Sequence, residues 1–90
     1  MADEEFKQTK AVALKYQKEK KAPPEVVAKG RGAVAEKIQN LAKENDVPLY
    51  NDKNLVEQLI RLEVAENIPP ELYKAVAEVL VFVYSLDRRN

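Results

Sequence analysis

The sequence contains no cysteine, no histidine and no tryptophan, and its only aliphatic hydroxyls are Thr9 and Ser85. Without cysteine or histidine the chain lacks the usual ligands of zinc and copper and the thiol nucleophile. Because neither hydroxyl can be paired with a histidine base, hydrolase triads and thiol redox chemistry are excluded. Carboxylate, lysine and backbone chemistry remain open.

An excess of charge of one sign is also lacking, since 15 basic and 15 acidic residues cancel. This balance argues against a generic nucleic-acid binder. The longest apolar run, residues 79–84, is far shorter than the roughly 20 residues that span a bilayer. Acidic residues Asp3, Glu4 and Glu5 make the start of the chain unlike a secretion signal. What remains is the composition of one small globular domain of 90 residues.

Three short strands are predicted. Val12, Leu14 and Tyr16 alternate with polar or small residues, which indicates a strand over 11–16. The Ala22-Pro23-Pro24 turn holds the backbone extended before a second strand at 25–29. A third strand is predicted at 47–50.

Helices are predicted where the apolar period lengthens, from Ala33, after Asn51 or Asp52, and after Pro69. The last helix is apolar most of the way round, so we expect it in the core or at an interface. The stripes that carry these predictions are Val34, Ile38, Leu41 and Ala42, then Leu55, Val56, Leu59, Ile60 and Leu62, then Leu72, Val76, Val79, Leu80 and Val83.

This order of elements predicts an α/β fold, a small three-layer domain. A short mixed β-sheet of about three strands would be packed by three or four helices. The chain is expected to divide into a flexible leader over 1–10, the domain over 11–87 and a tail over 88–90.

A glycine motif offers one alternative function. Gly30-Arg31-Gly32-Ala33-Val34-Ala35 matches G-x-G-x-x-A between a predicted strand and helix, with Asp52 about twenty residues on. It would make the chain a small nucleotide- or anion-binding module using Gly30–Ala35. Against this, a dinucleotide fold needs more strands than the chain supplies, and the glycines also suit a tight turn with positive φ.

Longer stretches of the sequence resemble a known family. They are Ala-Val-Ala-Leu-Lys-Tyr at 11–16, Val-Val-Ala-Lys-Gly at 26–30, Val-Pro-Leu-Tyr-Asn at 47–51 and Ile-Pro-Pro-Glu-Leu-Tyr-Lys-Ala-Val-Ala-Glu-Val-Leu at 68–80. Over residues 11–87 the chain resembles the cytoplasmic C-terminal domain of the FlhB family, with YscU and SpaS as injectisome members. The resemblance implies a role in type III protein export, where this domain switches substrate specificity between rod and hook proteins and filament proteins.

The family's self-cleaving Asn-Pro-Thr-His motif is lost. Its positions correspond to Phe6, Lys7, Gln8 and Thr9, so the cyclising asparagine, the proline and the histidine are all replaced. No Asn-Pro bond occurs anywhere in the chain. We therefore predict that the chain does not cleave itself and is not an enzyme.

The resemblance also implies that the family's membrane region and the strand before the cleavage motif are absent. Met1 and the acidic leader favour a stand-alone FlhB-like protein. The sheet would then be one strand short, with an open edge. Such an edge can accept a strand from a full-length FlhB-like protein or from a second copy of the chain. The alternative is that the leader or solvent covers the edge.

A small apolar patch is the candidate binding site. By resemblance it comprises Ala22, Pro23, Val56 and Leu59 and would bind export substrates, although Val56 and Leu59 also fit a plain core. The expected partners are flagellar or injectisome export-gate proteins and export substrates, with no nucleic acid, no cofactor, no metal and only indirect contact with the membrane. The sequence thus predicts a cytoplasmic export accessory, peripheral to the inner-membrane export apparatus, or a competitor of full-length FlhB.

Overall fold

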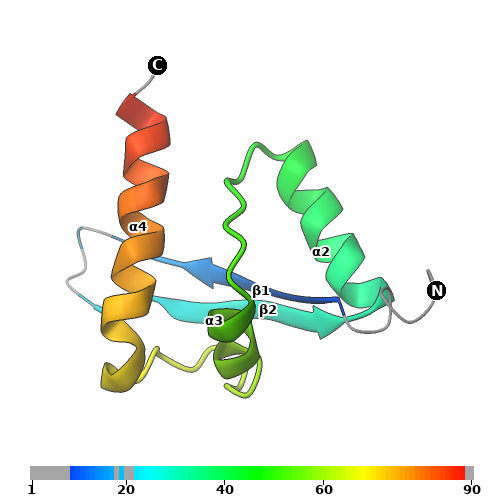
Figure 1. Ribbon diagram of the computed structural model, residues 1–90, viewed down its shortest axis with the longest axis horizontal. Helices are drawn as coiled ribbons and strands as arrows, with labels where there is room; N and C mark the ends of the chain where they lie inside the picture. Colours follow the sequence, from blue (N-terminus) through cyan, green and yellow to red (C-terminus); the bar gives the residue numbers. More distant parts are fainter. Residues whose placement is uncertain (1–8, 18, 20–21, 89–90) are drawn as a thin grey trace.

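The fold is seen in a computed structural model that describes residues 9–17, 19 and 22–88. Figure 1 shows the helix at 33–44 and the helix at 73–88 standing on either side of the segment 45–52, with the strands beneath. The elements are β1 (Lys10–Lys15), β2 (Glu25–Arg31), α2 (Ala33–Glu44), α3 (Lys53–Leu59), the 3-10 turn η2 (Pro70–Leu72) and α4 (Tyr73–Arg88). The predicted α/β class and its helices are confirmed.

The sheet differs from the prediction. β1 and β2 form a two-stranded antiparallel sheet, with Lys10 opposite Arg31 and a register shift after Ala13. Within the described part of the chain, the predicted mixed sheet and the predicted strand at 47–50 are wrong, because that segment pairs with neither strand. A strand exists only with a hydrogen-bonded neighbour, and a local pattern cannot supply one.

The two faces of the sheet carry side chains of different size. Residues opposite one another in the register share a face, so Ala11 and Gly30 lie on one side while Val12 and Lys29 lie on the other. The small face receives α2, whose Val34 lies directly over Gly30. The larger face receives α3 and α4, because Val12 packs against the cluster that these helices build. The sheet therefore forms a middle layer between helices.

The core is centred on Val26 and Ile68, which are 0% and 2% exposed. Val26 comes from the sheet, and Ile68 from the loop before η2. Burial of a side chain of this kind stabilises the fold by about 1.5–3 kcal/mol. The other buried members of the cluster are Leu55, Leu59, Leu72 and Val76.

Local signals position α3 and α4. Asp52 caps α3, since its carboxylate accepts a hydrogen bond of 3.0 Å from the Leu55 amide. Pro70 opens η2, where its missing N–H leaves no donor unpaired. α4 then leaves the core: Val76 is buried, whereas Val81 is 63% exposed. The sequence predicts this apolar helix in the core or at an interface. Its first turns lie in the core, and its later turns are available for an interface.

The two edges of the sheet are covered unequally. The Val26 amide donates to the Glu66 carbonyl, the Ala65 amide donates to the Val26 carbonyl, and the Ile68 amide donates to the Pro24 carbonyl. The loop at 65–68 thereby covers the first part of the outer edge of β2. Within the described chain, the outer edge of β1 has no neighbouring strand.

Candidate functional site

A groove of about 1090 Å³ lies along the uncovered edge of β1. It is lined by the run Thr9–Leu14 and by the segment 47–52, which runs across the direction of the strands in Figure 1. α2 contributes Ile38 and Ala42, and α4 contributes Val79, Leu80 and Val83. The sequence patterns predict these helix residues as apolar stripes without distinguishing core from groove. The excess of apolar surface around α4 is the one signal of the groove that the sequence carries.

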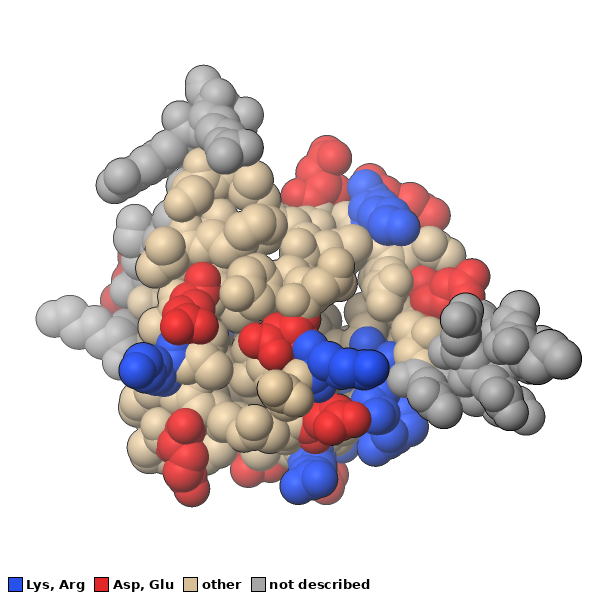
Figure 2. Space-filling view, in the orientation of Figure 1, with Lys and Arg blue, Asp and Glu red and all other residues tan. Residues whose placement is uncertain are grey.

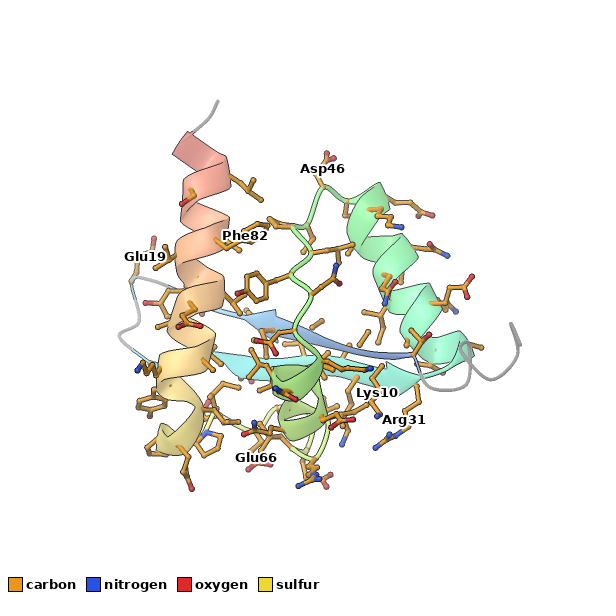
Figure 3. The ribbon with its side chains drawn as sticks, viewed as in Figure 1. Lys10, Glu19, Arg31, Asp46, Glu66 and Phe82 are labelled. Atoms are coloured by element: carbon orange, nitrogen blue, oxygen red, sulfur yellow. The ribbon has the colours of Figure 1, made fainter. Side chains whose placement is uncertain are left out.

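Aromatic rings join the groove wall to α4. Phe82 projects from α4 toward the segment after α2 (Figure 3), where its ring meets Tyr50 edge to face with centroids 5.2 Å apart. The same segment leaves Val47, Leu49 and Tyr50 between 40% and 53% exposed. In Figure 2 the surface between the upper part of α4 and the segment 47–50 is tan, with acidic side chains below it. This side of the groove therefore offers apolar surface to a partner.

One ion pair lies at the mouth of the groove. Lys10 Nζ donates to Glu57 Oε1 at 3.1 Å, linking β1 to α3, and Figure 3 shows Lys10 beside α3. The hydrogen bond from Lys10 and its charge hold the pKa of the Glu57 carboxyl below its ordinary value. Glu57 is half exposed, so solvent screens the pair and its contribution to stability is small.

A second lysine ties the sheet to the turn after α3. Lys29 Nζ donates to the carbonyl of Ile60 at 3.1 Å and to that of Leu62 at 2.7 Å. These carbonyls follow the end of α3, where helical partners run out. The sequence alone gave Lys29 no role, because a lysine in an alternating strand reads as solvent-facing.

The four residues of the predicted apolar patch fall into different environments. Ala22 is exposed, Pro23 and Val56 are half-buried, and Leu59 is buried in the core cluster at 4% exposure. Val56 and Leu59 line the groove, whereas Ala22 and Pro23 do not, although Pro24 does. Leu59 thus follows the plain-core alternative, and Val56 is the α3 residue of the pair with surface to offer.

The glycine motif has structural uses in this fold. Gly32 takes the positive φ of 59° that the turn into α2 requires, and its amide donates to the Thr9 carbonyl at 2.8 Å. Gly30 permits the close approach of Val34. Asp52, the position of a ribose-binding acid, caps α3 instead. These roles leave no observation that favours nucleotide binding.

Three of the four positions that match the cleavage motif, Phe6, Lys7 and Gln8, lie outside the described residues. Thr9, the fourth, is described, and its carbonyl accepts from Gly32 just ahead of β1. No helix in the described part of the chain is long and apolar enough to cross a membrane. The described residues also hold no cluster of three or more acidic side chains placed to bind a metal ion.

Comparison with known proteins gives one consistent result. Residues 8–83 match the model of the FlhB HrpN YscU SpaS family. The chain is 46% identical over 78 residues to the uncharacterized protein YlqH of Bacillus subtilis, covering 87% of this chain and 84% of YlqH. It is 49% identical over 79 residues to the flagellar biosynthetic protein FlhB of Yersinia enterocolitica, covering 87% of this chain but 21% of FlhB. The chain thus spans about a fifth of its FlhB relatives.

Solved structures agree with the sequence matches. The cytoplasmic domain of FlhB from Shewanella putrefaciens superposes with a TM-score of 0.82 at 34% identity, covering 89% of this chain and 66% of that one. The PscU C-terminal domain superposes with a TM-score of 0.77 at 29% identity, covering 82% and 95%. On the family model, the relatives and the shared fold together, the chain belongs to the FlhB, HrpN, YscU and SpaS family of type III export proteins and has the fold of the FlhB cytoplasmic domain.

Proposed function

We propose that the chain is a non-enzymatic component of type III protein export that works at the cytoplasmic side of the export apparatus. In this role it binds export substrates and export-gate proteins as the cytoplasmic domain of FlhB would. The observation that carries the proposal is the 0.82 TM-score match to that domain over 89% of the chain. The replacement of the cleavage motif by Phe6, Lys7, Gln8 and Thr9 supports a role that does not depend on self-cleavage.

The proposed substrate surface is the patch predicted from the sequence, reduced to its accessible members. Ala22 and Pro23 present an apolar turn, and Val56 adds a half-buried side chain on α3. Leu59 supports this surface from within the core. Small apolar patches of this kind are typical of sites that recognise short peptide segments.

The first experiment measures binding of a purified rod or hook protein to the full chain and to Ala22→Asp and Val56→Asp. Both variants are expected to weaken binding about tenfold while the melting temperature stays close to that of the parent chain. Val64→Asp is the matched control, because Val64 is 54% exposed and lies outside both the patch and the groove. Equal binding by all three variants would refute the patch.

The second experiment separates an accessory from a competitor. A strain that lacks this chain is scored for motility, alone and with its full-length FlhB weakened. If the chain is an accessory, its deletion is expected to worsen the motility defect of the weakened strain. If it is a competitor of full-length FlhB, its deletion is expected to relieve that defect. No change in either background would contradict a role in flagellar export.

A further inference from the structure

Basic side chains from three parts of the fold gather around the exposed face of α3. Lys10 opens β1 and Arg31 ends β2, and the two lie opposite each other in the register, so they share the face of the sheet that receives α3. Lys53 opens α3, and Arg61 follows two residues after its end. Figure 3 shows Lys10 and Arg31 together beside α3. These four residues form the basic cluster.

The basic cluster contains one carboxylate, that of Glu57. Glu57 lies four residues from Lys53 and four from Arg61, so it occupies the helix surface between them. Its pKa is lowered first by the hydrogen bond and charge of Lys10, and further by the charges of Arg61 and Lys53. Three of the four cations therefore act on this one side chain.

The other cations of the cluster keep their charges unpaired within the described chain. Arg31, Lys53 and Arg61 are exposed, and none of them forms an ion pair with another described residue. Glu57 is bonded to Lys10 alone. The cluster thus carries four positive charges against one negative charge.

This excess is a matter of placement, because the whole chain has 15 basic and 15 acidic residues. Like charges directly opposite each other on antiparallel strands destabilise the pair, and Lys10 and Arg31 are placed in this way. Glu57 relieves the repulsion for Lys10 only. An anionic group brought to this surface from outside would relieve the rest.

The basic cluster adjoins the substrate surface proposed above. Val56 follows Lys53 by three residues on α3, which makes the two side chains neighbours on the helix. Val56, Lys53 and Lys10 also line the same groove. A segment that covers Val56 therefore reaches the cations of the cluster as well.

Resting on the function proposed above, we propose that the basic cluster binds an acidic segment of an export substrate. Lys53 and Arg61 are eight residues apart, which on a helix is roughly 12 Å. An extended chain covers that distance in about four residues, and residues an even number apart point to the same side. The preferred segment therefore carries acidic residues four positions apart, with a residue of no negative charge facing Glu57 between them.

Broader polyanions fit the cluster less well than a narrow peptide. Asp52 precedes α3, and Glu63 and Glu66 follow Arg61, so carboxylates border the cluster at both ends of the helix. Figure 2 shows acidic side chains interspersed with the basic ones on the lower part of this face. A membrane or a nucleic acid would bring its phosphates against these carboxylates too, whereas an extended peptide meets the cations in a single strip.

The test uses the full chain and two synthetic peptides of about ten residues. One peptide has two aspartates four positions apart and a leucine beside the first, and the other has asparagines in place of the aspartates. At low salt the acidic peptide is expected to bind at least about tenfold more tightly, and added salt should reduce this preference. Equal binding of the two peptides, no binding at millimolar peptide, or a preference that salt leaves unchanged would overturn the proposal.

Substitutions in the chain test the cluster itself. Arg31→Gln, Lys53→Gln and Arg61→Gln should each weaken binding of the acidic peptide roughly two- to fivefold. Lys37→Gln is the matched control, because Lys37 is exposed on α2 and lies outside the cluster and the groove, and it should leave binding nearly unchanged. Glu57→Gln should tighten binding, since it removes the one negative charge of the site. An equal effect of the control, or weaker binding by Glu57→Gln, would contradict the proposal.

Binding of the rod or hook protein separates this proposal from the proposed function. If the three glutamine variants bind it as the parent chain does while Val56→Asp does not, the apolar patch is correct and the basic cluster is refuted. If the glutamine variants bind it more weakly while Val56→Asp binds normally, the basic cluster is correct and the apolar patch is refuted.

Other occupants of the cluster give different results. Tighter binding of phosphatidylglycerol vesicles or single-stranded DNA than of the acidic peptide would make the partner a lipid surface or a nucleic acid, and the proposal would be wrong. The variant that combines Asp3→Asn, Glu4→Gln and Glu5→Gln tests the chain's own acidic leader. If this variant binds the acidic peptide about tenfold more tightly than the parent chain, the leader occupies the cluster and the proposal is again wrong.

Discussion

Gly30 offers the sharpest test of how the helix layer sits on the sheet. A methyl group built at Gly30 would fall on Val34 Cγ1 and come within 2.7 Å of Val34 Cβ and 3.3 Å of its carbonyl carbon. The last two atoms belong to the main chain of α2 or lie next to it, so no rotation of the side chain relieves them. Gly30→Ala therefore forces α2 away from the small face of the sheet.

The expected cost follows from two opposing terms. Overpacking of this kind destabilises by about 1–3 kcal/mol. Alanine also restricts the unfolded chain, which offsets about 0.4–1 kcal/mol because Gly30 does not need positive φ. The net loss should be roughly 1–2 kcal/mol, which for a domain of this size lowers the melting temperature by roughly 5–15 °C.

The assay is urea unfolding of Gly30→Ala in three backgrounds, namely Val34, Val34→Ala and Val34→Gly. Val34 is 53% exposed, so its own truncation removes little core contact. Loss of Cγ1 should recover part of the cost of Gly30→Ala, and loss of Cβ as well should recover most of it. An equal cost in all three backgrounds would show that α2 does not rest on Gly30, and the reasoning would be refuted.

Three further predictions follow from single contacts. Asp52→Ala removes the cap of α3 and should destabilise the fold by about 1 kcal/mol, as measured by urea unfolding, with Asp52→Asn retaining most of the stability. The Glu57 carboxyl should titrate below its ordinary pKa by nuclear magnetic resonance and return toward that value in Lys10→Met. Because the pKa is lowered on folding, the pair stabilises the chain fully above the ordinary carboxyl pKa, and this contribution is lost as the pH falls through the lowered value. The chain should keep its intact mass through long incubation, since no Asn-Pro bond is present; specific loss of the first few residues would contradict this.

The sequence predicted best those elements whose cause is local. The stripe from Val34 to Ala42 requires only its own period to indicate a helix, and Asp52 caps α3 through an amide three residues away. The alternation at Val12 and Leu14 likewise located β1 to within a residue at each end.

The sequence failed where the cause is a distant partner. Val47-Pro48-Leu49-Tyr50 has strand propensity, but a strand also needs a neighbour, and none is present among the described residues. The resemblance placed Leu59 on a surface patch with Val56, although its spacing also fitted a plain core, and in the structure Leu59 is buried at 4% exposure. Lys29 could not be assigned to the carbonyls of Ile60 and Leu62, because that contact spans about thirty residues. Spacing describes an element, whereas burial and pairing depend on the rest of the molecule.

The unequal covering of the two sheet edges limits what association can follow. Loop 65–68 covers the first residues of the outer edge of β2, and the strand ends at the exposed Arg31, a charged side chain that discourages strand addition. Fibrous growth through sheet edges requires every unit to accept a strand and to present another. A molecule with one free sheet edge and one obstructed edge cannot extend such a fibre, because after one pairing no free edge remains for the next molecule. The outer edge of β1 can therefore stay uncovered without leading to fibres of this chain.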